Sequence, residues 1–240
     1  IRFFQSHGLL SLKDRPQWWT VDGGSREYVR RLTESYRDRI RLVGVRNVVR
    51  QVDKVIVIDH DGDISSYDHV VFATHADETV ALLFDCDERE RSILGKWRYT
   101  PNRAVLHSDP ALMPKRRRVW SSWNFLSDPA QQQLCVTYWM NRLQSIDTAY
   151  PLFETLNPVL SPCDDLVHGS YTYRHPIFDS AAIAAQSALA SIQGRDNLFF
   201  AGAWTGYGFH EDGLKSAIAI AKALGAEVQW ESDVEGYDKR

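Results

Sequence analysis

The sequence contains few cysteines and no recognisable cluster of metal ligands. Its three cysteines, Cys86, Cys135 and Cys163, are far apart in the 240 residues. Their odd number and wide spacing argue against a disulfide framework and a zinc motif, so we expect a reducing, cytoplasmic compartment. The eight histidines form no HExxH or HxH arrangement, and we therefore expect no bound metal.

Long apolar runs and a strong net charge are also missing. No stretch approaches the length of a membrane span, and no signal peptide is visible. The formal net charge of -3 gives no reason to expect a nucleic-acid partner. The one basic run, from Lys115 to Arg118, is either a solvated loop or a contact for an anionic headgroup or a phosphate. The second interpretation predicts peripheral contact with a membrane.

Several common catalytic and nucleotide-binding motifs are absent. The chain has no GxSxG elbow, which argues against a serine hydrolase, and no GxxxxGK[ST] loop. Gly206, Gly208 and Gly213 come near the GxGxxG fingerprint of a dinucleotide site, but Glu211 stands where the third glycine is required. A complete dinucleotide-binding site is therefore not encoded in this chain.

The clearest positive feature is the stretch NLFFAGAWTGYGFHEDGLKSAIAIAKALG, residues 197–225. An apolar run of strand length ends at Gly202, a glycine-rich turn follows, and apolar residues then recur at helical spacing up to Gly225. Asp212 is a plausible N-cap of this helix. A strand, a glycine turn and a helix start can present N–H groups to an anionic ligand. An ordinary connection at a sheet edge is the alternative.

The order of elements predicts a mixed α/β (α+β) fold in which one domain is interrupted. An α/β, Rossmann-like part is expected at 21–84 and 195–225. Within it, a helix is expected at 25–37 and a short strand at 40–42. A β-rich part is expected at 1–20 and 85–194, including a strand at 118–124, and 226–240 is expected to be a tail. The β-rich part is dense in aromatic residues, which form either a ligand-binding surface or an aromatic core.

Several motifs together resemble the family of flavin-containing amine oxidases and phytoene-desaturase-like proteins, over about residues 15–230. The C-terminal flavin motif of that family is similar to residues 199–203 (FFAGA) and 212–217 (DGLKSA). Gly23-Gly24 before a helix and residues 70–74 (VVFAT) follow the family's order. The finer matches are residues 120–125 (WSSWNF), 138–144 (YWMNRLQ), 155–158 (TLNP), His175-Pro176 and 206–213 (GYGFHEDG).

The resemblance implies the cofactor FAD and a set of residues that contact it. Val45 would meet its adenine end, and Ala73 and Thr74 would lie near the adenosine. The remaining contacts would come from Gly202 and Ala203 along the ribityl–pyrophosphate portion, and from Asp212, Gly213 and Leu214 at the pyrimidine edge of the flavin. This chain has Ala203 where the family usually has an acidic residue.

The resemblance also implies an oxidoreductase that moves a hydride from a substrate C–H bond to flavin. The candidate residues near the ring are Tyr173, His175, Tyr207 and His210, and the expected substrate is a small or lipid-like molecule. A non-catalytic flavin-fold module that binds a partner is one alternative, and a polyamine-type oxidase is a weaker one.

The family carries its GxGxxG unit at the N-terminus, and that unit is not in this chain, which starts at Ile1 rather than a methionine. We therefore expect the chain to be a C-terminal segment of a longer protein. By itself the segment should bind FAD weakly or not at all and be inactive. It should also self-associate through the face where the N-terminal half would pack.

Overall fold

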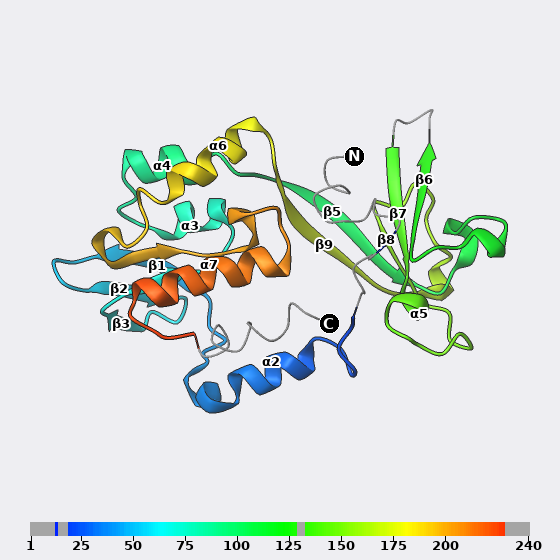
Figure 1. Cartoon of the computed structure of the whole chain (residues 1–240), viewed down its shortest axis with the longest axis horizontal. Helices are drawn as coiled ribbons and strands as arrows, with labels where there is room; N and C mark the ends of the chain where they lie inside the picture. Colours follow the sequence, from blue (N-terminus) through cyan, green and yellow to red (C-terminus); the bar gives the residue numbers. More distant parts are fainter. Residues whose placement is uncertain (1–12, 14–18, 129–132, 229–240) are drawn as a thin grey trace. The chain divides into compact units, whose positions relative to one another are not determined.

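A computed structural model describes residue 13, residues 19–128 and residues 133–228 (Figure 1). The chain divides into two compact units, each made of two segments. Unit 1 comprises Ile1–Ile40 and Asn102–Tyr173, and unit 2 comprises Arg41–Pro101 and Arg174–Arg240. No helix in the described part of the chain is long and apolar enough to cross a membrane.

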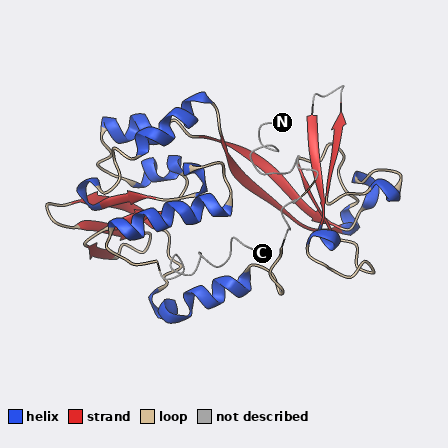
Figure 2. Ribbon diagram, in the orientation of Figure 1, coloured by secondary structure: helices blue, strands red, loops and turns tan. Residues whose placement is uncertain are grey.

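Unit 2 is the α/β part of the molecule (Figure 2). Its first sheet is an antiparallel meander in the order β1-β2-β3, formed by β1 (Val45–Arg50), β2 (Val55–Asp59) and β3 (Ile64–Tyr67). A hairpin turn at Asp61-Gly62 connects β2 and β3, and Gly62 has φ +87°. Its helices are α3 (Ala76–Leu82), α4 (Glu88–Leu94), α6 (Ser180–Leu189) and α7 (His210–Ala223).

A second, parallel pair of strands in unit 2 joins residues that are far apart in sequence. β4 (Val70–Phe72) pairs with β10 (Leu198–Phe200) residue by residue. The rings of Phe72 and Phe200 stack with their centroids 5.8 Å apart. Parallel strands need a crossover connection, and here the connection includes residues 102–173, the larger segment of unit 1. The interrupted α/β fold predicted from the sequence is confirmed.

Most buried apolar side chains of unit 2 form one cluster from its strands and helices, and Phe199, Ala201 and Ile220 form a second, smaller one. Trp97 and Trp204 meet edge to face in the larger cluster, with ring centroids 4.6 Å apart. Leu94 of α4 and Leu189 of α6 belong to the same cluster as Phe72 and Phe200.

Unit 1 is built on a sheet with the strand order β6-β7-β8-β5-β9. The strands are β5 (Arg98–His107), β6 (Trp123–Asp128), β7 (Gln133–Trp139), β8 (Phe153–Leu156) and β9 (Val167–Ile177). β5 and β9 continue into unit 2. Short helices occupy the connections: η2 (Pro110–Leu112), η3 (Arg117–Val119), α5 (Met140–Leu143) and η4 (Asp164–Leu166). Unit 1 also includes α2 (Arg26–Thr33) and η1 (Glu34–Arg39).

The predicted domain boundaries differ from the two units. Residues 21–40 belong to unit 1, whereas 85–101 and 174–194 belong to unit 2. The helices α4 and α6 were assigned to the β-rich part, but their buried side chains complete the α/β core. Helical periodicity shows which face of a helix is apolar without showing which sheet that face packs on, so the pattern could not make this assignment.

Three local predictions are corrected. Residues 40–42 form no strand. The strand expected at 118–124 is mostly η3 and a loop, and β6 begins only at Trp123. The helix expected at 25–37 changes to a 3-10 helix after Thr33, and four apolar side chains on it remain exposed: Tyr28, Val29, Leu32 and Tyr36.

Candidate functional site

The candidate site lies at the edge of unit 2 where β4 and β10 both end. Because the two strands are parallel, the loops that follow them leave at the same edge, which is where open α/β sheets bind ligands. Ala73 and Thr74 follow β4, and Gly202 and Ala203 follow β10. Trp204 Nε1 donates a hydrogen bond of 3.0 Å to the Thr74 carbonyl, which ties the two loops together. Four residues predicted to bind FAD are thereby brought together.

Gly202 joins the strand to the turn in a conformation that requires glycine. Its φ is +151°, and a Cβ there would lie 2.5 Å from Trp204 Nε1. The Gly202 N–H donates to Ser216 Oγ (3.0 Å), and this hydroxyl donates in turn to the Gly213 carbonyl (2.7 Å). The loop is therefore attached to the first turns of α7, which packs on η6 (Ala203–Thr205).

The carboxylate of Asp212 organises the glycine-rich turn. Its Oδ2 accepts hydrogen bonds from the N–H groups of Tyr207 (2.9 Å) and Phe209 (3.0 Å). Gly206 lies so close that a Cβ would be 2.4 Å from the Asp212 Cγ. The predicted role of Asp212 as N-cap is wrong, because the N-cap is Phe209 and Asp212 is the third residue of α7. An acid at this third position supports the turn that enters the helix.

Several features of this edge fit a polar, electron-rich cofactor such as FAD. Among the described residues, the N–H groups of Ala203, His210 and Glu211 have no acceptor. The latter two belong to the first turn of α7, where the helix dipole also favours negative charge. Gly213 has an ordinary helical backbone, and a Cβ there would make only an ordinary contact, 3.6 Å from the Ala203 nitrogen. A glycine in a helix costs about 1 kcal/mol relative to alanine, and no neighbouring protein atom requires one here. A ligand that approaches the backbone closely would explain it.

A histidine and a tyrosine are stacked at the same edge, where α3 begins. The ring centroids of His75 and Tyr99 lie 4.3 Å apart, and the interplanar angle is 16°. Tyr99 Oη accepts a hydrogen bond of 2.9 Å from the Ala76 N–H, and burial raises the pKa of Tyr99 to about 12. His75 Nδ1 is buried and makes no hydrogen bond within the described part of the chain, since Glu78 Oε1 is 3.9 Å away. An unpaired buried nitrogen at this edge also fits a cofactor that supplies the missing partner.

The other predicted residues of unit 2 lie around this edge or behind it. Val45 begins β1 and packs against the core cluster. Leu214 is partly exposed on α7. Tyr207 and His210 are both exposed at the turn that enters α7, and the ring of Tyr207 has its centroid 6.4 Å from that of Phe178. Tyr207 and His210 therefore border the Asp212 turn, and their catalytic roles remain predictions.

The two remaining candidates lie on β9. Tyr173 belongs to unit 1, is exposed and stacks on Tyr171, with ring centroids 6.3 Å apart. His175 belongs to unit 2 and is exposed. A role near the flavin ring remains a prediction for both residues.

Sequence reasoning missed four residues that shape the site: Ser216, Trp204, Gln186 and Tyr99. Gln186 Nε2 donates to the Gly206 carbonyl at 2.5 Å and so holds the turn from the side of α6. Only Ser216 carried a usable signal, since it follows Gly213 by about one helical turn and its hydroxyl can bond back to that carbonyl. The other three act across long sequence distances that no local pattern encodes.

The fold is an α/β unit with a second, β-rich unit, and the edge where β4 and β10 end carries groups that fit a cofactor. The family described as flavin containing amine oxidoreductase matches residues 3–225, and the chain therefore belongs to this family. No curated protein matches the chain.

Solved structures of a fatty acid isomerase and of a putrescine oxidase share the fold. The CLA-producing fatty acid isomerase from P. acnes is 14% identical with a TM-score of 0.52, and the match covers 75% of this chain and 47% of that one. A triple mutant of putrescine oxidase is 12% identical with a TM-score of 0.59, covering 85% of this chain and 53% of that one. A double mutant of putrescine oxidase gives a TM-score of 0.60 with the same identity and coverage. The chain thus spans about half the length of each of these proteins.

Proposed function

We propose that this chain is the flavin-ring side of an FAD-dependent oxidoreductase that takes a hydride from a C–H bond of a lipid-like or fatty-acyl substrate. The observation that carries the proposal is the edge where β4 and β10 end, with unpaired N–H groups on Ala203 and on the first turn of α7. Membership of a flavin-containing family supports the choice of FAD for this edge.

FAD, when bound, would supply the hydride acceptor, and the chain's own residues would hold and polarise it. Ala203 and the start of α7 would offer N–H groups to its electron-rich atoms, and this positive end would favour the added negative charge of the reduced form. Gly202 and Gly213 would allow close approach of the backbone. Ala73 and Thr74 would contact the part of the cofactor nearest β4.

The lipid-like substrate is supported by the fatty acid isomerase among the structural neighbours. The two putrescine oxidase structures favour a second candidate, a polyamine-type oxidase. Release of hydrogen peroxide on addition of putrescine or spermidine would support the second candidate. Reduction of bound flavin by unsaturated fatty acids, without a response to amines, would support the first.

The flavin part of the proposal is tested by the absorption spectrum of the whole purified protein and by matched variants. Asp212→Ala should lower flavin occupancy, because the Tyr207 and Phe209 N–H groups lose their acceptor and the turn loosens. Glu211→Ala removes one negative charge from the same helical turn, but its side chain only pairs with Lys215 at 3.7 Å. Glu211→Ala should therefore leave flavin occupancy unchanged. Equal flavin occupancy in both variants, or a whole protein without flavin, would contradict the proposal and favour a non-catalytic module.

We further propose that residues 1–240 alone bind FAD weakly or not at all and are inactive, because they contain no GxGxxG unit. Titration of the chain with FAD, followed by flavin fluorescence, measures this affinity, and submicromolar binding would refute it. Self-association is a related proposal, supported by the exposed apolar side chains of α2 and η1. Sedimentation of the chain over a range of concentrations tests it.

A further inference from the structure

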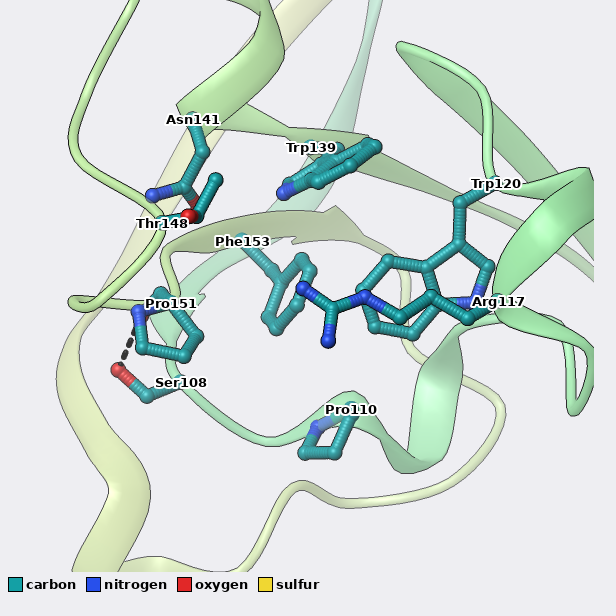
Figure 3. A pocket seen from close by; sticks show the side chains of 9 residues that line it. All are labelled: Ser108, Pro110, Arg117, Trp120, Trp139, Asn141, Thr148, Pro151 and Phe153. Carbon is teal, nitrogen blue, oxygen red and sulfur yellow. Dashed lines mark hydrogen bonds between the residues drawn. The ribbon is translucent and has the colours of Figure 1, made fainter.

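A cavity of about 180 Å³ lies in unit 1, at the end of the sheet where β5 and β7 finish and β8 begins (Figure 3). It is separate from the edge described above and is formed only by residues of unit 1. Its lining residues are Ser108, Pro110, Arg117, Trp120, Trp139, Asn141, Thr148, Pro151 and Phe153.

Aromatic rings form much of the cavity wall. The Trp120 ring meets Trp139 edge to face, with centroids 5.4 Å apart at an interplanar angle of 88°. It meets Phe153 in the same way at 5.7 Å. Trp120 is fixed by a 2.7 Å hydrogen bond from its Nε1 to the Pro114 carbonyl. Such a wall suits a planar, apolar ligand body.

The loop of residues 144–152, which borders the cavity, is fixed by hydrogen bonds to the buried side chain of Asn141. The side-chain amide of Asn141 donates to the carbonyls of Asp147 and Tyr150 (both 2.9 Å), and its Oδ1 accepts from the Leu152 N–H (2.8 Å). Ser108 Oγ donates to the Pro151 carbonyl at 2.6 Å, the bond drawn in Figure 3. The cavity is therefore preformed and does not depend on a ligand to order its walls.

Arg117 supplies the only positive charge in the lining. Its guanidinium lies 5.5 Å from the centroid of the Trp120 ring, and Figure 3 shows it extending across the cavity in front of Phe153. In the described part of the chain, neither Arg117 nor its basic neighbours Arg116 and Arg118 make an ion pair. A guanidinium held on an aromatic face, with its donors unpaired, is ready to bind a carboxylate.

We propose that this cavity binds a small organic carboxylate whose apolar body is about one ring in size. The aromatic wall would take the ring, and Arg117 would pair with the carboxylate. The volume agrees, since an apolar cavity of roughly 150 Å³ accommodates benzene. Inorganic phosphate fits less well, because it would leave the aromatic wall unused and would meet a single guanidinium. The basic run thus contributes one specific contact through Arg117, while Arg116 and Arg118 are outside the lining.

The test is ¹⁹F NMR of 4-fluorobenzoate with the whole protein, in competition with unlabelled benzoate. Arg117→Gln removes the charge from the lining, and Arg116→Gln removes the same charge from a neighbouring exposed position outside the lining. The expected result is saturable binding that weakens at least about tenfold in Arg117→Gln and stays within about twofold of the native value in Arg116→Gln, as the loss of one charge-assisted hydrogen bond predicts. Neutral 4-fluorobenzyl alcohol should bind more weakly than 4-fluorobenzoate.

Three results would overturn the proposal. The first is the absence of saturable binding at millimolar 4-fluorobenzoate. The second is an equal loss in the two arginine variants, which would indicate a diffuse effect of the basic run. The third is equal affinity for 4-fluorobenzyl alcohol, which would show that the cavity is only an apolar gap in the packing and does not recognise the carboxylate. Since the probe needs no flavin, failure of this test leaves the flavin site untouched.

Discussion

At the scale of single residues, Gly202 is a position where a side chain has little room and the backbone has a positive φ. We predict that Gly202→Ala destabilises unit 2 by about 2–4 kcal/mol, since its φ of +151° is strained for alanine and the new Cβ would lie 2.5 Å from Trp204 Nε1. Trp204 would have to move, and its hydrogen bond to the Thr74 carbonyl would be lost. Urea unfolding followed by circular dichroism measures the change.

The matched control for Gly202 is Gly62→Ala in the β2–β3 hairpin. Gly62 also has a positive φ, +87°, but no atom lies within 4 Å of the position of its Cβ. The control keeps the backbone strain and lacks the collision, so it should cost only about 1–2 kcal/mol. Equal losses in the two variants would show that the contact between Gly202 and Trp204 does not constrain the turn.

At the scale of elements, the strand β1 is joined to α4 by a buried ion pair. Arg50 on β1 pairs with Glu90 on α4, and their side chains are 14% and 0% exposed. Arg50 also contacts Asp85, with Nη1 2.9 Å from Oδ1. We predict that Arg50→Ala lowers the free energy of unfolding by about 3–5 kcal/mol, because it leaves the Glu90 carboxylate buried with no countercharge and with only the Asp87 N–H donating to it at 3.1 Å.

The control for Arg50 is the exposed pair of Lys54 and Asp68, whose side chains are 51% and 78% exposed. Lys54→Ala should cost no more than about 1 kcal/mol. The double variant Arg50→Ala with Glu90→Leu should be more stable than Arg50→Ala alone, because it removes the buried charge. Denaturant unfolding of the four proteins decides the matter, and a double variant weaker than the single one would contradict the role given to Glu90.

Single elements were predicted well where the local pattern carried the information. The strand and helix of residues 197–225 follow from an apolar run, a glycine stop and helical spacing, and the structure has β10 and α7 there. β4 and β10 are separated in sequence by residues 102–173 of unit 1, so no local pattern indicates that they pair. Their pairing was expected only as a consequence of the fold class. The assignment of α4 and α6 to the wrong part has the same origin, since an apolar helix face does not identify its partner.

The candidate site was predictable where glycines and the family motif marked the backbone. Gly202 and Asp212 do lie at the turn, as the motif implied. The N-cap was misplaced because an acid at the third helical position and one at the cap look alike in sequence. Trp204 and Tyr99 were missed because their hydrogen bonds reach backbone groups of another loop, Thr74 and Ala76.

At the scale of the whole molecule, unit 1 buries a series of hydrogen-bonded polar side chains among its apolar ones. His107, Thr137 and Thr155 are completely buried in it. His107 Nδ1 accepts a hydrogen bond of 3.2 Å from the Asp109 N–H, so its proton is on Nε2, which lies 2.8 Å from Thr155 Oγ1. Thr155 then donates to Thr137 (2.9 Å), and Thr137 to the carbonyl of Leu112 (3.4 Å). Every donor in this series of hydrogen bonds has one acceptor. A second proton, on His107 Nδ1, would remove the acceptor of the Asp109 N–H.

Because of this series of hydrogen bonds, we expect the stability of unit 1 to fall in a defined range of acid pH. Burial lowers the pKa of His107 from its ordinary 6.5, while the nearby Asp109 opposes the shift and His168 adds to it. The unfolded chain therefore binds the proton first, so the contribution of His107 to stability is complete above pH 6.5 and is lost as pH falls below it. Hydrogen bonds from the Cys163 and Ala111 N–H groups lower the pKa of Asp109 below 3.8, so Asp109 acts only in stronger acid.

We predict that lowering the pH from about 7.5 to about 5, above the range in which most carboxylates titrate, destabilises unit 1 and leaves unit 2 unchanged. Two free cysteines report on the units separately, since Cys135 is buried in unit 1 and Cys86 is half-buried in unit 2. Urea titrations at each pH, each followed by a short pulse of thiol reagent at one fixed pH and mass spectrometry, give a midpoint for each cysteine. The Cys135 midpoint should move to lower urea as the pH falls, the Cys86 midpoint should stay, and His107→Gln should abolish the shift. If both midpoints move together, the two units unfold as one and the buried histidine does not act on unit 1 alone.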